Sequence, residues 1–406
     1  MAALHALTQA PRHAGGDGDV SGKRFLIACG GTGGHLSPGI ALAEGLVACG
    51  HRVTLLISHK KVDARLVEKY PHFTFLRIPG APFSWKPVGL ARFLWQQLKG
   101  LAFGLILVRR ERPHAVVGFG GFTTASIILA GFLHRVPVAL HEANHVPGRA
   151  IRRLSKLARR VYLPPGVALP GLKEGKLLSL GLPVRREIVR EAAASARTAL
   201  DLDPKQPVLV ILGGSQGATA LNDWARANAA AFAADGVQTY CVTGLGKNQG
   251  EVTEYLRRDG GTAKVIFSPF CDRMGTLMSA ADLVVSRAGA GTLAELARCG
   301  TPSVLIPFPH AADNHQEANA RYFMEQGGGI TLAQSCMDEL APAVRELIAN
   351  ETELRKFRDA LQRLDQANAL GVMIADIEQL TGGTSAAPKT ASSSAPLHAS
   401  AGGSTS

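Results

Sequence analysis

Four glycine-rich segments, each following a short apolar run, are the first candidates for chemistry in this 406-residue chain. They are 30–35 (GGTGGH), 118–121 (GFGG), 213–217 (GGSQG) and 289–292 (GAGT). A glycine turn between a strand and a helix exposes backbone N–H groups at the helix N-terminus, where phosphates bind. One such turn is ordinary, but four at the same end of their strands predict a ligand that carries phosphate.

The loops do not fit a nicotinamide dinucleotide or a P-loop nucleotide. Leu36 stands where GxGxxG requires its last glycine, and no acid follows the apolar run 52–57 to hold a ribose. Segment 289–294 reads GxGxxA, but its acid, Glu295, comes immediately after instead of about 20 residues on. GxxxxGK[ST] is absent. A nucleotide sugar fits better, because it needs a diphosphate cradle, a base pocket and a ribose acceptor.

Short runs rich in Val, Ile and Leu must position these loops. The first series of expected strands is 24–29, 52–57, 73–78, 115–117, 137–140 and 161–163, and the second is 208–212, 238–243, 264–267, 283–285 and 303–307. Runs that are apolar on both faces and alternate with helical patterns predict parallel strands in an α/β sheet. Two series, each opening with strand, glycine loop and helix, predict two Rossmann-like domains whose loops meet at one cleft.

Charge and composition separate the two halves. Residues 1–190 hold 27 Lys and Arg against 9 Asp and Glu, a net charge of +18, whereas the remainder is net −6. A basic first half predicts an anionic partner there. Residues 1–22 and 382–406 are small and polar and are expected to be disordered tails. The first 22 residues lack a signal-peptide core and no stretch approaches a membrane span, so we expect a cytoplasmic protein.

Six segments resemble one known family in type and order. They are GGTGGHLSPGIALAEGL (30–46), HEANHVPG (141–148), GLPVR (181–185), GGSQGA (213–218), SRAGAGTLAEL (286–296) and PHAADNHQEANA (309–320). This series is similar to that of the MurG family of N-acetylglucosaminyltransferases, in glycosyltransferase family 28, over about residues 23–380. The resemblance implies the GT-B fold of two facing Rossmann-like domains, an α/β class with parallel sheets.

The same resemblance implies an activity and a domain plan. Such enzymes transfer N-acetylglucosamine from UDP-GlcNAc to the muramoylpentapeptide on undecaprenyl diphosphate (lipid I to lipid II) in peptidoglycan synthesis. They invert the anomeric carbon without a catalytic metal or other cofactor, as peripheral proteins on the cytoplasmic face of the bacterial inner membrane. We expect an acceptor and membrane domain at 23–190, a UDP-GlcNAc domain at 191–364 and a final helix at about 365–381 returning to the first domain. Further cell-wall synthesis proteins are implied as partners.

Glycosyl transfer needs a base for the acceptor hydroxyl. His35 ends the first glycine loop, and an imidazole titrates near neutrality, which suits it to accept this proton. Glu142, beside His141 at the end of another strand, is the alternative base. A structural hydrogen bond would explain Glu142 equally well, and His35 could also be an ordinary helix-start residue.

The resemblance implies roles for further residues at the donor. Glu295 would accept from the ribose hydroxyls, Arg185 would stabilise the departing UDP, and backbone groups at Cys271 would bind uracil. Asn144 and Gln316 would bind sugar hydroxyls. The diphosphate would lie at Ser215, Ala290, Gly291, Thr292, Leu293 and Ala294, with Thr32, Gly33 and Gly34 of the first loop completing the UDP-GlcNAc site. The first two glycine loops would also hold the acceptor diphosphate.

Two positions depart from the family pattern. Leu182 stands where the family has Asn in GNPVR, and Ala143 lies within the family's HExN segment. Loss of the amide at 182 is expected to weaken a polar contact near the donor. Arg185, His141, Glu142 and Asn144 are retained.

Segment 81–113 mixes aromatic and cationic side chains. A membrane patch is predicted from Phe83, Trp85, Lys86, Arg92, Phe93, Trp95 and Lys99. Apolar residues at helical spacing are expected in the core, namely Leu90, Leu94, Leu98, Leu101, Leu105 and Val108. A buried helix with a basic face is the alternative.

Other functions fit the sequence less well. Asp17-Gly18-Asp19 and Asp201-Leu202-Asp203 mimic a DxD metal motif but lie in a tail and a linker, so no metal site is predicted. The six cysteines lack CxxC spacing and are expected as free thiols. A pI of 9.7 alone would allow nucleic-acid binding, but the charge lies in one half without a recognition motif. A UDP-GlcNAc epimerase, a galactosyltransferase and a nicotinamide oxidoreductase are the remaining alternatives.

Overall fold

The structure is a computed structural model that describes residues 22–30, 33–58, 66–81, 86–121, 123–173, 175–214, 217–246, 250–365 and 369–382. Thr32, Phe83, Trp85 and Ser215 from the predicted sites lie outside the described residues, as does nearly all of the expected tails.

The first sheet is parallel throughout, with strand order β3-β2-β1-β4-β5-β6-β7. Its strands are β1 (Arg24–Ala28), β2 (Arg52–Ile57), β3 (Thr74–Arg77), β4 (Ala115–Gly118), β5 (Val138–His141), β6 (Arg160–Leu163) and β7 (Leu177–Ser179). Alternate residues of β1 enter different cores: Phe25 and Ile27 lie on one face, Leu26 and Ala28 on the other. Both faces are therefore buried, as in the parallel sheets of α/β proteins.

Helices cover each face of this sheet. They are α2 (Gly33–Ala48), α4 (Pro87–Glu111), α5 (Thr124–Leu133) and α6 (Arg149–Leu154). Leu36 and Ile40 of α2 pack on one face, and Phe103 and Leu107 of α4 pack on the other. The glycine turn leads directly into α2, so the helix starts at Gly33, before Pro38 where the sequence predicted it.

The second sheet repeats the plan, with order β10-β11-β9-β8-β12-β13-β14. Its strands are β8 (Val208–Leu212), β9 (Gln238–Val242), β10 (Glu251–Leu256), β11 (Thr262–Ser268), β12 (Leu283–Ser286), β13 (Ser303–Leu305) and β14 (Gly329–Thr331). Its helices are α7 (Ala193–Ala199), α8 (Thr219–Ala234), α9 (Met274–Ala280), α10 (Ala290–Cys299), α11 (His315–Glu325), α12 (Met337–Ala349) and α13 (Glu351–Leu364). Short 3₁₀ turns lie at Ala312–Asn314 and Gln334–Cys336. The antiparallel edge strand β10 was not predicted.

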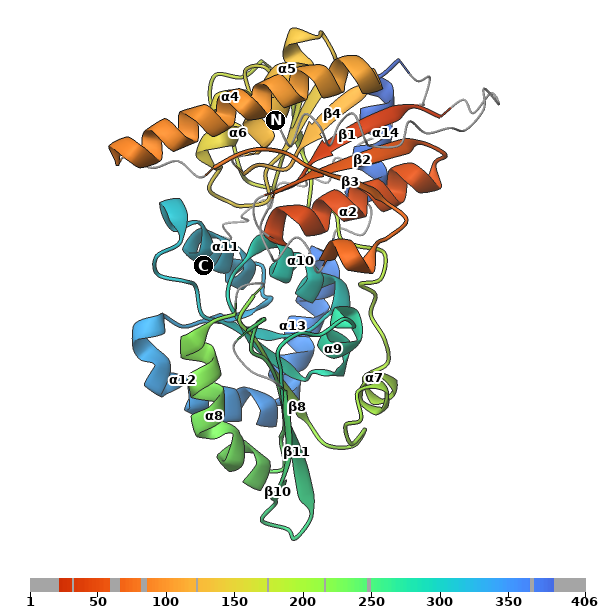
Figure 1. Ribbon diagram of the computed structural model, residues 1–406. Coiled ribbons are helices and arrows are strands. Elements are labelled where there is room, and N and C mark those ends of the chain that lie inside the picture. Colours follow the sequence, from red (N-terminus) through yellow and green to blue (C-terminus); the bar gives the residue numbers. More distant parts are fainter. Residues whose placement is uncertain are drawn as a thin grey trace, which may run out of the picture.

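The chain returns to the first sheet at its end. Helix α14 (Ala369–Leu380) places Met373 and Ile377 in the core shared with β1 and α2. Asp376 accepts from the Arg160 guanidinium at 2.8 and 2.7 Å and from the Tyr162 hydroxyl at 2.8 Å. In Figure 1 this blue helix lies beside the red and yellow first domain, whereas α13 lies in the second domain. The polypeptide therefore crosses between the two domains twice.

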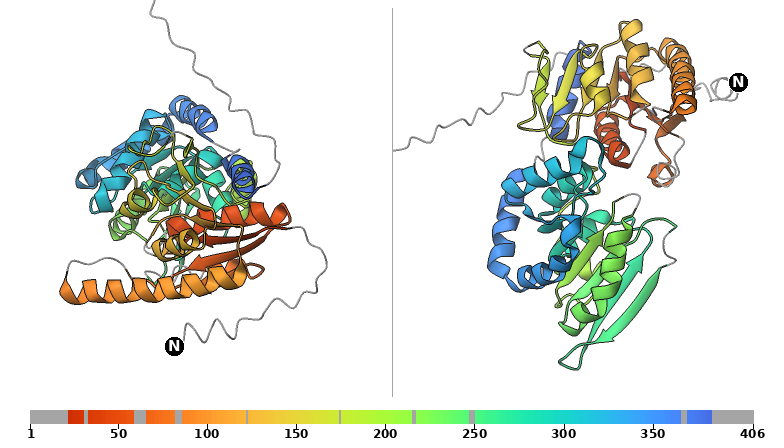
Figure 2. Two further views of the ribbon diagram at one scale, coloured as in Figure 1. Left: turned by 90° about the horizontal axis from the view of Figure 1, so that it is seen from above. Right: turned by 90° about the vertical axis from the view of Figure 1, so that its left-hand side faces the viewer.

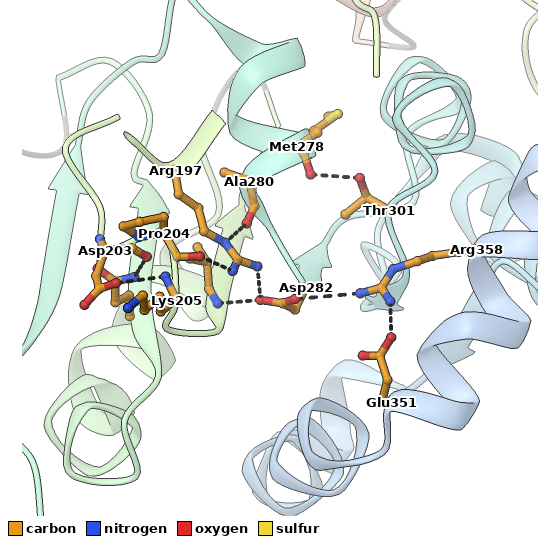
Figure 3. A network of polar contacts seen from close by, with 12 residues as sticks. Arg197, Asp203, Pro204, Lys205, Met278, Ala280, Asp282, Thr301, Glu351 and Arg358 are labelled. Carbon is orange, nitrogen blue, oxygen red and sulfur yellow. Dashed lines mark hydrogen bonds and ion pairs between the residues drawn. The ribbon is translucent and has the colours of Figure 1, made fainter. Parts of the chain in front are cut away.

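A polar network fastens the linker helix α7 to the second domain (Figure 3). Asp282 accepts from Arg197 at 2.6 Å and from the Val208 backbone N–H at 2.7 Å. Arg197 also donates to the carbonyls of Ala280 and Pro204. Before α14 rejoins it, the first core runs as far as Leu180, and the second core begins with Val184.

Helix α4 departs from its predicted packing. Its buried residues are Gly100, Phe103, Gly104, Leu107 and Val108, whereas Leu94 and Leu98, expected in the core, are 58% and 59% exposed. The two views agree that one end of this helix extends beyond the sheet (Figures 1 and 2). Within the described ranges, no helix combines the length and apolarity needed to cross a bilayer.

Candidate active site at the interdomain cleft

The carboxyl ends of both sheets face a common cleft between the domains. Figure 1 shows α2 of the first domain above α10 of the second, and Ser37 Oγ donates to Glu295 Oε1 across this boundary at 3.4 Å. A cavity at the boundary is lined from one side by Ala143 and Gly181 and from the other by Ala290 and Leu293. Open α/β sheets bind ligands at these strand ends, so the predicted loops lie where a ligand would bind.

His35 lies in the first turn of α2, half-buried, against the second glycine loop. A Cβ added to Gly120 would lie 3.3 Å from His35 Nε2, and one added to Gly121 would lie 3.6 Å from Nδ1. Both glycines have positive φ, 93° and 81°. The loop therefore needs glycine twice over, for its backbone conformation and for room beside the imidazole.

The first two glycine loops touch each other. Thr123 Oγ1 donates to the Gly30 carbonyl at 2.8 Å, and a Cβ on Gly121 would lie 2.8 Å from the same oxygen. The structure thus brings Gly30 and His35 of the first loop together with Gly120 and Gly121 of the second.

Glu142 is the anchor of its own loop. The carboxylate is 5% exposed. Its Oε1 accepts from the backbone N–H and the amide of Asn144 at 2.9 and 3.0 Å, and its Oε2 accepts from the Gly148 N–H at 2.7 Å. Three donors on one carboxylate fix the turn 142–148.

His141 is buried beneath this loop. Its imidazole is 1% exposed, and Nε2 lies 3.2 Å from the Gly181 carbonyl, which accepts. Burial disfavours the charged ring and lowers the pKa of His141 to about 4. The ring is therefore neutral at physiological pH and donates through Nε2.

Glu295 and Arg185 form an ion pair at the cleft. Arg185 Nη2 lies 3.0 Å from Glu295 Oε1, and its Nη1 lies 2.8 Å from Glu187 Oε1. Arg185 is 7% exposed. Burial alone would lower the pKa of Arg185, but the attraction of the nearby Glu295 and Glu187 carboxylates raises it. The guanidinium is thus permanently charged and fixed by two carboxylates.

The N-terminus of α10 can hold an anion. Gly289 is its N-cap, and helix residues Ala290, Gly291 and Thr292 follow. A Cβ on Gly291 would meet nothing within 4 Å, so the turn faces open space. With its helix dipole and unpaired N–H groups, this turn suits a diphosphate.

The structure also describes other residues predicted at the donor. Gly213 and Gly217 close the loop after β8, with Gly217 at φ 66°. Burial raises the pKa of Cys271, so its thiol stays protonated at physiological pH. Gln316 opens α11 and accepts through Oε1 from the Phe308 N–H at 2.9 Å.

Several contacting residues were not identified from the sequence. Ser37 and Glu187 hold Glu295 and Arg185, and Asn319 bonds Asn144 across the domains. Asn319 lies inside a segment that carried the resemblance (309–320), which was the available signal. Among the described residues, no group of three or more His, Cys, Asp or Glu could hold a metal ion.

Comparisons with known proteins agree with this site. The model of the glycosyltransferase family 28 N-terminal domain matches residues 25–163, and that of its C-terminal domain matches 208–370. A protein of Opitutus terrae named UDP-N-acetylglucosamine–N-acetylmuramyl-(pentapeptide) pyrophosphoryl-undecaprenol N-acetylglucosamine transferase is 56% identical, covering 90% of this chain and 98% of its own. A protein of the same name from Desulforudis audaxviator is 34% identical, covering 88% and 99%.

Solved structures agree with both the fold and the family. The crystal structure of Acinetobacter baumannii MurG has a TM-score of 0.65 at 25% identity, covering 88% of this chain and 99% of that one. The calicheamicin glycosyltransferase CalG4, at 14% identity and a TM-score of 0.63 over 90% and 100%, shares the fold. The predicted GT-B architecture is confirmed, and the chain belongs to glycosyltransferase family 28, as a glycosyltransferase of its MurG family.

Proposed function

We propose that this glycosyltransferase transfers N-acetylglucosamine from UDP-GlcNAc to the muramoylpentapeptide carried on undecaprenyl diphosphate. The names of the relatives supply the substrates. One observation carries the assignment to this site: Ser37, two residues after His35, contacts Glu295 at 3.4 Å across the cleft. The first turns of α2, which carry the candidate base, therefore lie next to the helix that carries the candidate ribose carboxylate, as a reaction between two bound substrates requires.

The donor binds mainly to the second domain. The N-terminus of α10 and the loop at Gly213–Gly217 hold the diphosphate, Glu295 accepts from the ribose, and backbone groups at Cys271 contact uracil. Asn144 and Gln316 bind sugar hydroxyls. The position of Gly289–Thr292 at a helix N-terminus supports the diphosphate assignment. The acceptor diphosphate lies at the two loops around His35.

The reaction exchanges one glycosidic bond for another. His35 takes the proton of the acceptor hydroxyl as its oxygen attacks the anomeric carbon from the face opposite UDP. The bond from that carbon to the phosphate oxygen breaks, and UDP leaves with the electron pair. The α10 dipole and Arg185 stabilise its charge. Glu142 shapes the loop that carries Asn144, because its lone pairs already accept three hydrogen bonds.

The enzyme acts at the cytoplasmic face of the inner membrane, as a peripheral protein. The acceptor's undecaprenyl chain is stable only in a bilayer, since each buried CH₂ is worth about 0.8 kcal/mol. Helix α4 supplies the contact surface, with Trp95 exposed beside Lys99, whose Nζ lies 4.9 Å from the indole centre.

The test is a transfer assay with UDP-GlcNAc, with UDP-galactose as the competing donor and lipid-linked muramoylpentapeptide as acceptor. His35→Gln should lower kcat by about 10²–10⁴-fold with little change in KM, because it removes general-base catalysis. Glu142→Gln should mainly raise KM for the donor, because it distorts the loop of Asn144. EDTA should leave transfer intact.

Three results would contradict the proposal. A preference for UDP-galactose would refute the assignment of UDP-GlcNAc as the donor. A loss of sugar transfer in EDTA that Mg²⁺ restores would refute the departure of UDP without a metal. If Glu142→Gln lost more kcat than His35→Gln at unchanged KM, Glu142 would be the base.

A further inference from the structure

Asn319, on α11, joins the two domains through a single buried amide. Its side chain is 0% exposed. Nδ2 donates to the Ala288 carbonyl and to Asn144 Oδ1, each at 3.1 Å, and Oδ1 accepts from the His145 backbone N–H at 2.9 Å. Ala288 immediately precedes the N-cap of α10, so this one amide bonds both to the donor turn and to the loop anchored by Glu142.

The orientation of this amide is fixed by backbone groups. The Ala288 carbonyl can only accept and the His145 N–H can only donate, so a flipped Asn319 would oppose like groups at both positions. The orientation found is therefore the one that satisfies both backbone partners. Both protons of Nδ2 are used, one of them on Asn144.

Asn319 in turn dictates the orientation of Asn144. Because Asn319 presents a proton, Asn144 must present Oδ1 to it and turn Nδ2 toward Glu142, where the bond measures 3.0 Å. A proton on Nδ2 and a lone pair on Oδ1 remain for a ligand. Without Asn319, Glu142 alone would hold this amide.

These bonds join the two domains. Asn144 and His145 belong to the first domain, and Asn319 and Ala288 to the second. Around them, the rings of His145 and Tyr322 stack at 3.9 Å. Arg149 and Arg152 also pair with Asp313 at 3.2 and 3.0 Å. Across the domain boundary, a series of hydrogen bonds therefore runs from the residue before α10 through Asn319 to Asn144.

We propose that Asn319 is a positioning residue: across the domain boundary it holds the Asn144 amide in the orientation that binds the donor sugar. The inference rests on the proposed function, in which Asn144 contacts that sugar. Asn319 itself need not touch the donor. It acts on the sugar end of UDP-GlcNAc and leaves the uridine end, held by the second domain, unaffected.

The test compares Asn319→Ala and Asn319→Asp with wild type, each also in an Asn144→Ala background. In Asn319→Asp a carboxylate oxygen would face the Ala288 carbonyl and Asn144 Oδ1, so the Asn144 amide should flip. Thr301→Val is the matched control, because it removes a buried hydrogen bond to the Met278 carbonyl of 2.8 Å away from the cleft. Thermal unfolding of every variant checks that it is folded.

Asn319→Ala should lower kcat/KM for UDP-GlcNAc about tenfold or more, while the Kd of UDP in calorimetry stays within about twofold. In the Asn144→Ala background the same change should cost less than about threefold, because the two residues act as one unit. Asn319→Asp should lower kcat/KM at least as much as Asn319→Ala does, and the kcat/KM of Thr301→Val should equal that of wild type.

The inference would be overturned if Asn319→Ala lowered kcat/KM by the same factor with and without Asn144→Ala, because the two losses would then be independent. It would also be overturned if Asn319→Ala weakened UDP binding as much as it lowered kcat/KM. Failure of the proposed function is visible separately, as wild-type protein that binds UDP-GlcNAc more tightly than UDP yet transfers no sugar to the lipid acceptor. In that case the affinity advantage of UDP-GlcNAc over UDP still tests Asn319, since it should disappear in Asn319→Ala. Wild type that binds both equally would refute the inference directly.

Discussion

At the scale of single residues, burial separates the groups that hold the site from those placed to react. His141 and Glu142 are adjacent, almost fully enclosed and bonded to main-chain groups of their own domain. His35 is half-buried and packs on glycines that leave it room. A proton acceptor must reach its substrate, which favours the less buried imidazole of His35 as the base we propose.

His141 makes stability depend on pH. Its folded pKa of about 4 lies below the ordinary value of 6.5, so between these values the unfolded chain binds more protons. The contribution of His141 to the free energy of unfolding is therefore fully present above pH 6.5. It declines as the pH falls toward 4, by roughly 3 kcal/mol. Urea unfolding of wild type and His141→Gln at pH 7, 5.5 and 4 measures it. Parallel losses in both proteins would show that His141 is not the cause.

Glu295 supplies the next prediction. Glu295→Ala should weaken UDP binding by about 1–3 kcal/mol, because the ribose would lose a charged acceptor. Ser37→Ala is the control: it removes the 3.4 Å contact to Glu295 but leaves the carboxylate and its ion pair with Arg185. We expect calorimetry to find the control unchanged. Equal UDP affinity in Glu295→Ala and wild type would remove Glu295 from the ribose site.

At the scale of helices and strands, the buried elements were predictable and the half-exposed ones were not. Strands such as 208–212 are apolar on every residue, which predicts a central parallel strand directly. Strand β10 (EVTEYL) is an exposed antiparallel edge, and its mixed residues carry no such signal. Leu94 and Leu98 follow helical spacing, but spacing alone does not tell whether another element covers that face.

The cleft shows a second limit to what the sequence alone predicts. The glycine loops and Glu295 follow strand ends, so their convergence on one edge could be predicted from topology. Ser37 and Asn319 meet their partners from the other domain, at separations of 258 and 175 residues. No local pattern encodes such pairings. The domain bounds and the site roles remain predictions.

Asp282 tests how the linker helix α7 is held (Figure 3). Asp282→Ala should lower the free energy of unfolding by about 2 kcal/mol, because it leaves the mostly buried Arg197 and the Val208 N–H without their acceptor. Glu251→Ala breaks the exposed ion pair with Arg226 and should cost less than about 1 kcal/mol. Urea unfolding compares the two. Similar losses would mean that the Asp282 network contributes no more than a surface pair.

At the scale of the whole molecule, the two domains differ in net charge and in shape. The net charge of +18 falls in residues 1–190, while the remainder is net −6. The protruding α4 belongs to the basic half and exposes Leu94, Trp95 and Leu98. An exposed apolar face beside cations suits the interface of an anionic bilayer. A soluble donor would then meet a lipid-bound acceptor at the cleft without either leaving its phase.

Vesicle co-sedimentation tests this docking surface. Wild type should bind anionic vesicles more than neutral ones, because each surface cation contributes about 1 kcal/mol that salt screens. Rising salt should weaken binding without abolishing it, because apolar burial is not screened. Arg92→Gln with Lys99→Gln should remove most of the preference for anionic lipid, whereas Trp95→Ala with Leu98→Ser should remove the part that resists salt.

The matched control lies in the other domain, where Val252 and Leu256 of β10 are also exposed, at 63% and 76%. If any exposed apolar pair could dock the protein, Val252→Ser with Leu256→Ser would lower binding as much as the α4 pair does. We expect this control to sediment like wild type, because β10 lies in the half of net negative charge. If wild type bound both lipids equally, or if the α4 variants bound like wild type, α4 would be a solvent-exposed helix and the acceptor would have to be approached by another surface.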